Sequence, residues 1–147
     1  MQRPTVRSGI VGAGFAARFH FEAVQRVHSA DVEVVGVFDT NAEAARRFAE
    51  ERGLEVFDSL EALIDAADVV HACVPPVAHE PVAVAALQRD THVIVEKPFT
   101  GYFGDGSEDF NGQTFPKETM LEGALASARR MLEAEAKSRA RPSTRFR

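Results

Sequence analysis

The segment Ile10-Val11-Gly12-Ala13-Gly14-Phe15-Ala16-Ala17 decides the fold of this chain, because an apolar strand ends there in a glycine turn. The strand is predicted over Val6–Val11, and a stripe of apolar residues predicts a helix over Phe15–Val27. Gly12 permits a tight turn after the strand, and Gly14 lets another group approach the backbone without meeting a Cβ. The chain therefore opens with a strand, a glycine turn and a helix.

The alternation of strand and helix continues through the first hundred residues. Further strands are predicted over 32–38, 55–57, 69–74 and 92–95, and further helices over 41–52, 58–66 and 81–88. The strands are apolar throughout, which indicates a parallel sheet covered on both faces. With right-handed crossovers, this predicts an α/β fold with a doubly wound, mostly parallel sheet, the Rossmann fold.

The turn matches the dinucleotide fingerprint Gly-x-Gly-x-x-Gly/Ala, with Ala17 in the third place. Ala17 is small enough for the helix to lie close on the sheet, and the backbone N–H groups at the helix start favour phosphate. We therefore expect the turn residues Gly12, Ala13, Gly14, Phe15, Ala16 and Ala17 to bind a dinucleotide. A tight strand–helix turn without a ligand remains the alternative.

An acid ends the second predicted strand, in the pair Asp39-Thr40. Its carboxylate would accept hydrogen bonds from adenosine ribose hydroxyls and repel a 2′-phosphate, so the sequence favours NAD over NADP. The acid lies further from the glycines than is usual, and it also suits the start of the next helix. NADP stays open, because Arg46 and Arg47 follow in that helix.

The strand over 92–95 runs into the turn Glu96-Lys97-Pro98, at the carboxyl edge of the sheet where ligands bind in such folds. A lysine beside a cofactor there can exchange a proton with a substrate hydroxyl. By its residue types alone, the turn is equally well explained by a surface lysine without a catalytic role, followed by a structural proline. The sequence does not decide whether Pro98 is cis.

From Gly9 to Pro98 the chain resembles the Gfo/Idh/MocA oxidoreductases. The resemblance rests on the glycine turn with His20 following, and on the segments 37–41, 57–63, 74–79 and 92–98 in this order. It implies NAD(P)-dependent oxidation of a hydroxyl on a sugar, polyol or similar substrate. It also implies that Lys97 is the active-site lysine and that Glu96 lies beside the nicotinamide ribose.

The resemblance further implies that Val74, Pro75 and His79 line the cofactor cleft. For His79, a role at the start of the next helix is an equal alternative. His20 and His71 are assigned to packing, and the spacing of the five histidines predicts no metal site. Cys73 is expected to be a small core residue.

Composition limits the other classes of function. No apolar run approaches the roughly 20 residues that span a bilayer, and no apolar signal segment precedes the first strand, so we expect a cytoplasmic protein. The net charge is −5. The segment from Arg129 onward is basic and the rest is acidic, which argues against a nucleic-acid partner.

We expect three parts: a dinucleotide-binding domain over 1–98, a loop and bridging helix over 99–138, and a basic tail without regular structure over 139–147. Family members continue into a substrate domain, so we expect a truncated product that holds the nucleotide-binding half. The alternative functions are an inactive family member or a non-enzymatic NAD-binding module. Uncovered apolar surface on the bridging helix would favour homo-oligomers.

Overall fold

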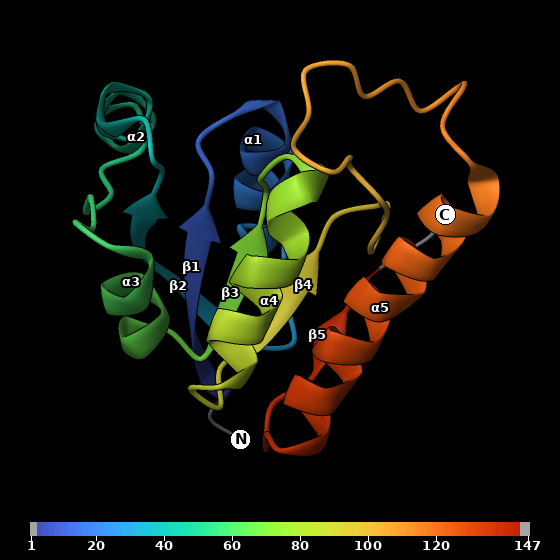
Figure 1. Cartoon of the computed structure of the whole chain (residues 1–147). Coiled ribbons are helices and arrows are strands. Elements are labelled where there is room, and N and C mark those ends of the chain that lie inside the picture. Colours follow the sequence, from blue (N-terminus) through green and yellow to red (C-terminus); the bar gives the residue numbers. More distant parts are fainter. Residues whose placement is uncertain (1–2, 145–147) are drawn as a thin grey trace.

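The computed structural model describes residues 3–144 as one parallel sheet with the strand order β2-β1-β3-β4-β5 (Figure 1). Its strands are β1 (Thr5–Val11), β2 (Asp31–Phe38), β3 (Val69–Ala72), β4 (His92–Val95) and β5 (Pro142–Ser143). Its helices are α1 (Phe15–Val24), α2 (Ala42–Glu50), α3 (Leu60–Ala66), α4 (His79–Leu87) and α5 (Lys117–Ala136), with a short 3₁₀ turn η1 (Pro76–Ala78). The strand order reverses at β1, which has β2 on one side and β3 on the other.

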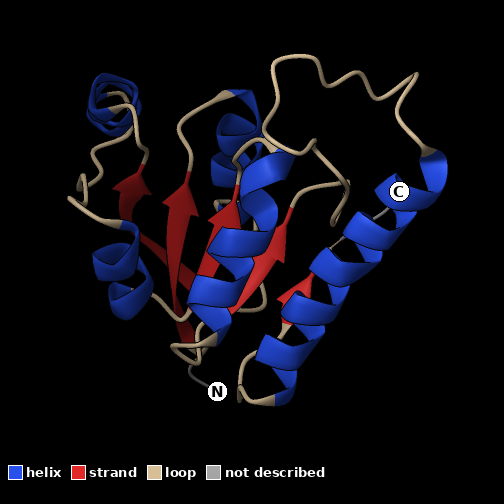
Figure 2. Cartoon of the chain, viewed as in Figure 1, coloured by secondary structure: helices blue, strands red, loops and turns tan. Residues whose placement is uncertain are grey.

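Helices lie on both sides of the sheet (Figure 2), and consecutive residues of a strand point to opposite faces. Ile10 belongs to an apolar cluster with Ala17 of α1 and Phe48 of α2. Val11 belongs to a second cluster, which contains Leu63 of α3 and side chains of α4 and α5. Helices therefore cover both faces, and the predicted doubly wound α/β fold is confirmed.

The helix α2 begins where its capping residue predicts. The side chain of Asn41 accepts hydrogen bonds from the backbone N–H groups of Glu43 and Ala44, each at 3.1 Å. These contacts satisfy two of the N–H groups that a helix start leaves without an intrahelical partner. The direction in which the chain leaves β2 is thereby fixed locally.

The strand predicted over residues 55–57 is wrong in extent. Only Val56 makes an isolated parallel bridge, to Val37 of β2. Two backbone hydrogen bonds join the segments, from Val37 N to the oxygen of Glu55 and from Phe57 N to the oxygen of Val37, both at 2.9 Å. The chain then turns at once into α3, which leaves no length for a longer ladder.

The tail predicted over 139–147 is also corrected, as far as the structure describes it; residues 145–147 lie outside the described part. Pro142 and Ser143 form β5, in parallel register with Val93 and Ile94 of β4. Ala140 is fully buried. A strand of two residues carries no period-2 pattern, so only contacts distant in sequence could specify it.

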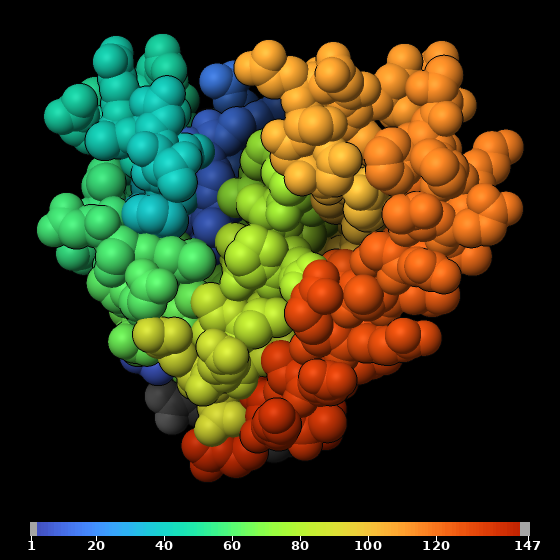
Figure 3. All heavy atoms as spheres, viewed as in Figure 1, coloured from blue at the N-terminus to red at the C-terminus, as the bar shows by residue number. Residues whose placement is uncertain are grey.

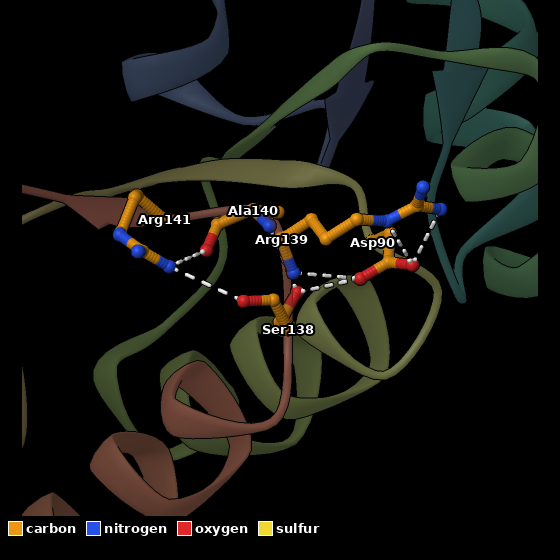
Figure 4. A network of polar contacts seen from close by, with 5 residues as sticks. All are labelled: Asp90, Ser138, Arg139, Ala140 and Arg141. Atoms are coloured by element: carbon orange, nitrogen blue, oxygen red, sulfur yellow. Dashed lines mark hydrogen bonds and ion pairs between the residues drawn. The ribbon is translucent and has the colours of Figure 1, made fainter.

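Figure 4 shows the polar contacts that hold this tail against the turn before β4. The carboxylate of Asp90 accepts hydrogen bonds from the Arg139 backbone N–H at 2.8 Å and from the Ser138 hydroxyl at 3.2 Å. The Arg139 guanidinium adds a bond of 2.9 Å to the other oxygen. Asp90 therefore anchors the end of α5 and directs the chain along β4.

The segment between β4 and α5 is a long loop, as predicted. It is organised around three rings, because Tyr102 stacks on Phe115 with centroids 5.5 Å apart and Phe110 packs edge-on against both. Tyr102 also lies against α5 at Gly123, where an added Cβ would be 2.3 Å from the tyrosine ring. Aromatic packing, rather than regular secondary structure, holds the loop on the helix.

Candidate dinucleotide-binding site

The candidate site lies on the carboxyl edge of the sheet, where four strands end side by side. Their last residues are in register across the sheet in the order Phe38, Val11, Ala72 and Val95. The residues that follow them are Asp39, Gly12, Cys73 and Glu96. Because neighbouring parallel strands lie about 4.8 Å apart, Asp39 and Glu96 mark two ends of a row roughly 14 Å long.

The glycine turn occupies the centre of this row. Gly12 has a φ of +93°, and an added Cβ would lie 2.4 Å from the carbonyl oxygen of Cys73. A Cβ on Gly14 would meet no protein atom within 4 Å. Gly12 is therefore required by the protein itself, whereas the absence of a side chain at Gly14 leaves open space above the start of α1.

Asp39 holds the turn from the side of β2. One of its carboxylate oxygens accepts a hydrogen bond from the backbone N–H of Ala13 at 2.7 Å, and the other accepts one from the N–H of Asn41 at 2.8 Å. The acid thus joins the end of β2 to the turn after β1. Each oxygen keeps a lone pair for a further donor, such as a ribose hydroxyl.

A cavity of about 730 Å³ opens over this edge, within the range of small-molecule and cofactor sites. Figure 3 shows the surface recessed there, with the blue β1–α1 segment between the teal α2 region and the green β3–α4 region. Seven predicted residues line the cavity: Gly12, Ala13, Gly14, Asp39, Thr40, Val74 and Pro75. The open space at Gly14 and the helix start behind it fit a diphosphate.

The remaining predicted residues do not line the cavity. Ala17, in α1, is fully buried, which agrees with its expected packing against the sheet, and Phe15 is 78% exposed. Ala16, His79, Glu96 and Lys97 also lie outside the lining.

Sequence reasoning did not assign Asn41 and Ala44 to the cavity, and it treated Arg47 only as a residue that could offset the preference for NAD. All three line the cavity. They stand three positions apart at the start of α2, so they share one side of the helix. Helical spacing counted from the cap at Asn41 was the signal that could have identified this set.

Glu96 and Lys97 lie beyond the cavity, at the end of β4. His20 Nε2 lies 2.7 Å from an oxygen of Glu96, and this contact is the main reason that the pKa of Glu96 is below its usual value. Lys97 is exposed, and within residues 3–144 its side chain takes part in no hydrogen bond or ion pair. The Lys97–Pro98 peptide bond is cis.

His79 supports the cavity wall from behind. Its side chain is buried, and its ring nitrogens lie 2.8 Å from the carbonyl oxygen of Pro98 and 3.1 Å from that of Val74. Its side chain makes no capping bond at the start of α4. The imidazole instead connects the ends of β3 and β4.

Cys73 lies in the floor of the cavity and is buried, as expected for a core residue. Burial raises the pKa of its thiol to about 12, with a smaller effect from the charge of Glu96. Among residues 3–144, no group of three or more His, Cys, Asp and Glu side chains could hold a metal ion. Within the same range, no helix has the length and apolar character needed to cross a bilayer.

Comparison with known proteins agrees with this geometry. A family model described as the oxidoreductase family with an NAD-binding Rossmann fold, Gfo/Idh/MocA, matches residues 6–109. The chain belongs to this family. The resemblance noted from Gly9 to Pro98 is therefore confirmed, and the family description agrees with NAD as the cofactor.

Two curated relatives are dehydrogenases. The UDP-N-acetylglucosamine 3-dehydrogenase of Acidithiobacillus ferrooxidans is 38% identical over 95 residues, which cover 65% of this chain and 29% of that protein. An inositol 2-dehydrogenase of Corynebacterium glutamicum is 32% identical over 99 residues, which again cover 65% of this chain and 29% of that protein. The chain thus spans less than a third of the length of these relatives.

A solved structure of the same UDP-N-acetylglucosamine 3-dehydrogenase superposes with a TM-score of 0.65 at 30% identity. The match covers 88% of this chain and 36% of that one. The shared fold therefore extends beyond the residues matched by the family model.

Proposed function

We propose that this chain binds NAD at the carboxyl edge of its sheet and supplies the nucleotide-binding half of a dehydrogenase. The substrate would be a sugar or a cyclic polyol, oxidised at a hydroxyl-bearing carbon. The relatives named above support this substrate class, because one acts on a nucleotide-linked amino sugar and the other on inositol. Residues 1–98 would bind the cofactor, and residues 99–138 would lead toward a substrate domain.

One observation carries the proposal: the register of the strands brings three chemically distinct groups onto one edge. Asp39 offers acceptors for ribose hydroxyls, the glycine turn offers open backbone for a diphosphate, and Glu96-Lys97 stand at the other end. The glycine turn and the acid are features of dinucleotide-binding sheets, and Glu96-Lys97 stand where the other half of a dinucleotide would extend. NAD is preferred over NADP because the Asp39 carboxylate would repel a 2′-phosphate.

Lys97 is proposed as the catalytic residue. NAD, when bound, accepts the hydride from the carbon of the substrate alcohol. The hydroxyl of that alcohol must lose its proton in the same oxidation, and the Lys97 amine is an exposed group at this end of the cleft that can take it. Within residues 3–144 no ion pair holds the Lys97 side chain, so it is able to turn toward a substrate.

Titration of the chain with NADH, followed by nucleotide fluorescence, tests the binding site. Gly14→Ala should leave the unfolding midpoint unchanged, because the new methyl group meets no protein atom, and should weaken NADH binding about tenfold or more by filling the diphosphate space. Gly112→Ala is the matched control, since its Cβ would make only ordinary contacts of 3.8 Å or more. Undiminished binding by Gly14→Ala would refute the assigned site.

Formation of NADH from NAD with a panel of sugars and inositols tests the catalytic assignment. Lys97→Ala should abolish turnover while NADH binding changes by less than about threefold, because the amine acts on the substrate proton and not on the diphosphate. Lys117→Ala, at the first position of α5, is the control. Turnover that survives Lys97→Ala would contradict the role of the lysine. Binding without turnover by the unaltered chain is the result expected both of a nucleotide-binding half and of a non-enzymatic NAD-binding module.

A further inference from the structure

Three side chains from different elements form a continuous polar chain behind the end of β4. His71 Nδ1, in β3, lies 2.8 Å from His20 Nδ1, in α1, and His20 Nε2 lies 2.7 Å from a carboxylate oxygen of Glu96. His71 is buried, and the His20 and Glu96 side chains are 15% and 32% exposed. This set of contacts thus runs from His71 in the core to Glu96 at the rim of the proposed cleft.

Both ring nitrogens of His20 take part in hydrogen bonds, and the donor in each can be assigned. The Glu96 carboxylate only accepts hydrogen bonds, so Nε2 of His20 carries a proton. The contact between the two Nδ1 atoms contains a single proton, which His71 supplies when His20 is neutral and His20 supplies when it is charged. Burial lowers the pKa of His71 to about 4, so His71 is neutral near pH 7 in either case.

Glu96 stands at the end of the cleft that the nicotinamide half of a dinucleotide would reach. Asp39 and Glu96 stand at opposite ends of the aligned row, with the glycine turn between them. If the adenosine ribose lies at Asp39, the other half of the dinucleotide extends over the ends of β3 and β4. It then reaches Glu96, whose partly exposed carboxylate is oriented by His20.

We propose that His20 and His71 are positioning residues that hold the Glu96 carboxylate at the nicotinamide end of the cleft, where it favours the oxidised cofactor over the reduced one. This inference rests on the proposed NAD site. The oxidised ring carries a positive charge and the reduced ring is neutral, so a fixed nearby carboxylate attracts only the former. The adenosine half is common to both forms and gives no such difference.

Calorimetric titration with NAD⁺ and with NADH, at one fixed pH, tests the proposal. His20→Leu should weaken NAD⁺ binding about tenfold and change NADH binding by less than about threefold, because a charge-assisted hydrogen bond no longer orients Glu96. Glu96→Gln should give the same selective loss. His71→Leu should give a smaller loss of the same kind, and the exposed His28→Ala should give none.

The double variant His20→Leu/Glu96→Gln separates positioning from a merely structural role. If His20 acts through Glu96, the double variant binds NAD⁺ as Glu96→Gln alone does. Equal losses for both nucleotides in His20→Leu, or additive losses in the double variant, would overturn the proposal.

His20→Gln retains an N–H donor toward Glu96, so it should restore most of the NAD⁺ affinity and provides a variant should His20→Leu fail to fold. Loss of the NAD⁺ preference in His20→Gln would also count against the proposal. If the unaltered chain bound neither nucleotide, the proposed NAD site itself would fail, and that result is distinct from the others.

Discussion

At the residue scale, single groups in this site serve two segments at once. The Asp39 carboxylate binds the backbone of the glycine turn and the backbone that leads into α2. The His79 ring contacts backbone oxygens that follow two different strands. The cleft therefore has walls fixed by the protein, which limits the conformational cost of binding a ligand.

Gly12 is the residue at which the fold tolerates least change. Gly12→Ala should lower the free energy of unfolding by about 2–4 kcal/mol, because the residue has a positive φ and its Cβ would overlap the Cys73 carbonyl. Urea denaturation measures the effect. An unchanged midpoint would show that the backbone can relax away from this contact.

His71 should make the stability of the chain sensitive to mild acid. Its pKa in the folded protein is about 4, lowered from an ordinary value of 6.5 chiefly by burial. Between pH 6.5 and pH 4, His71 is therefore protonated in the unfolded chain and neutral in the folded one. Stability is therefore retained above pH 6.5 and lost as the pH falls toward 4, by up to about 3 kcal/mol.

His71→Leu removes this group and should flatten the corresponding part of the profile, measured by urea denaturation at pH 7 and pH 5. Carboxylates with lowered pKa values, such as Glu96, lose their stabilising contribution only at still lower pH, below their usual 4.5. A steep loss between pH 7 and pH 5 that persists in His71→Leu would assign it to another group.

At the scale of elements, the loop after β4 depends on α5 for its conformation. Its three aromatic rings form a small cluster, and Gly123 provides the flat place on the helix where Tyr102 packs. A glycine inside a helix costs about 1 kcal/mol relative to alanine, so this position is explained by packing and not by helix propensity. The loop is an ordered part of the fold.

Gly123→Ala should therefore destabilise the chain despite the better helix propensity of alanine, by about 1–3 kcal/mol, because the methyl group would overlap the Tyr102 ring. Thermal unfolding followed by circular dichroism provides the measurement. Gly123→Ala combined with Tyr102→Ala should recover part of the loss, and a stabilised single variant would contradict the packing.

At the scale of the whole molecule, α5 and β5 close one side of the fold. The Arg130 side chain pairs with Glu80 of α4, and Asp90 binds the end of α5. These contacts are mostly exposed and individually weak. Their effect is to place β5 along β4, which would otherwise be the edge strand of the sheet.

Asp90→Gly tests this arrangement without adding backbone strain, because glycine adopts the φ of +57° found at Asp90. The variant should increase hydrogen exchange at the Val93 amide, which donates to the Arg141 oxygen at 3.2 Å, and leave the β1 amides protected. Asp109→Gly, in the exposed loop, is the control. Unchanged exchange at Val93 would show that β5 holds without Asp90.

Most of the fold and about half of the candidate site could be predicted, because they depend on local patterns. The glycine turn, the acid after β2 and the Glu-Lys-Pro turn each follow an apolar strand, and parallel topology brings such positions to one edge. The side of α2 that faces the cavity was not assigned, although helical spacing counted from the cap at Asn41 indicates it.

The sequence by itself determined the strand–helix alternation and the chemistry at the ends of β1, β2 and β4. Only the tertiary structure decided that His20 contacts both His71 and Glu96, that the His79 ring contacts the backbone after β3 and β4, and that Pro142 and Ser143 form β5. The reason is distance along the chain: His20 is 51 residues from His71 and 76 from Glu96. Contacts of this kind arise from how the helices pack on the sheet, and no local pattern of residues encodes them.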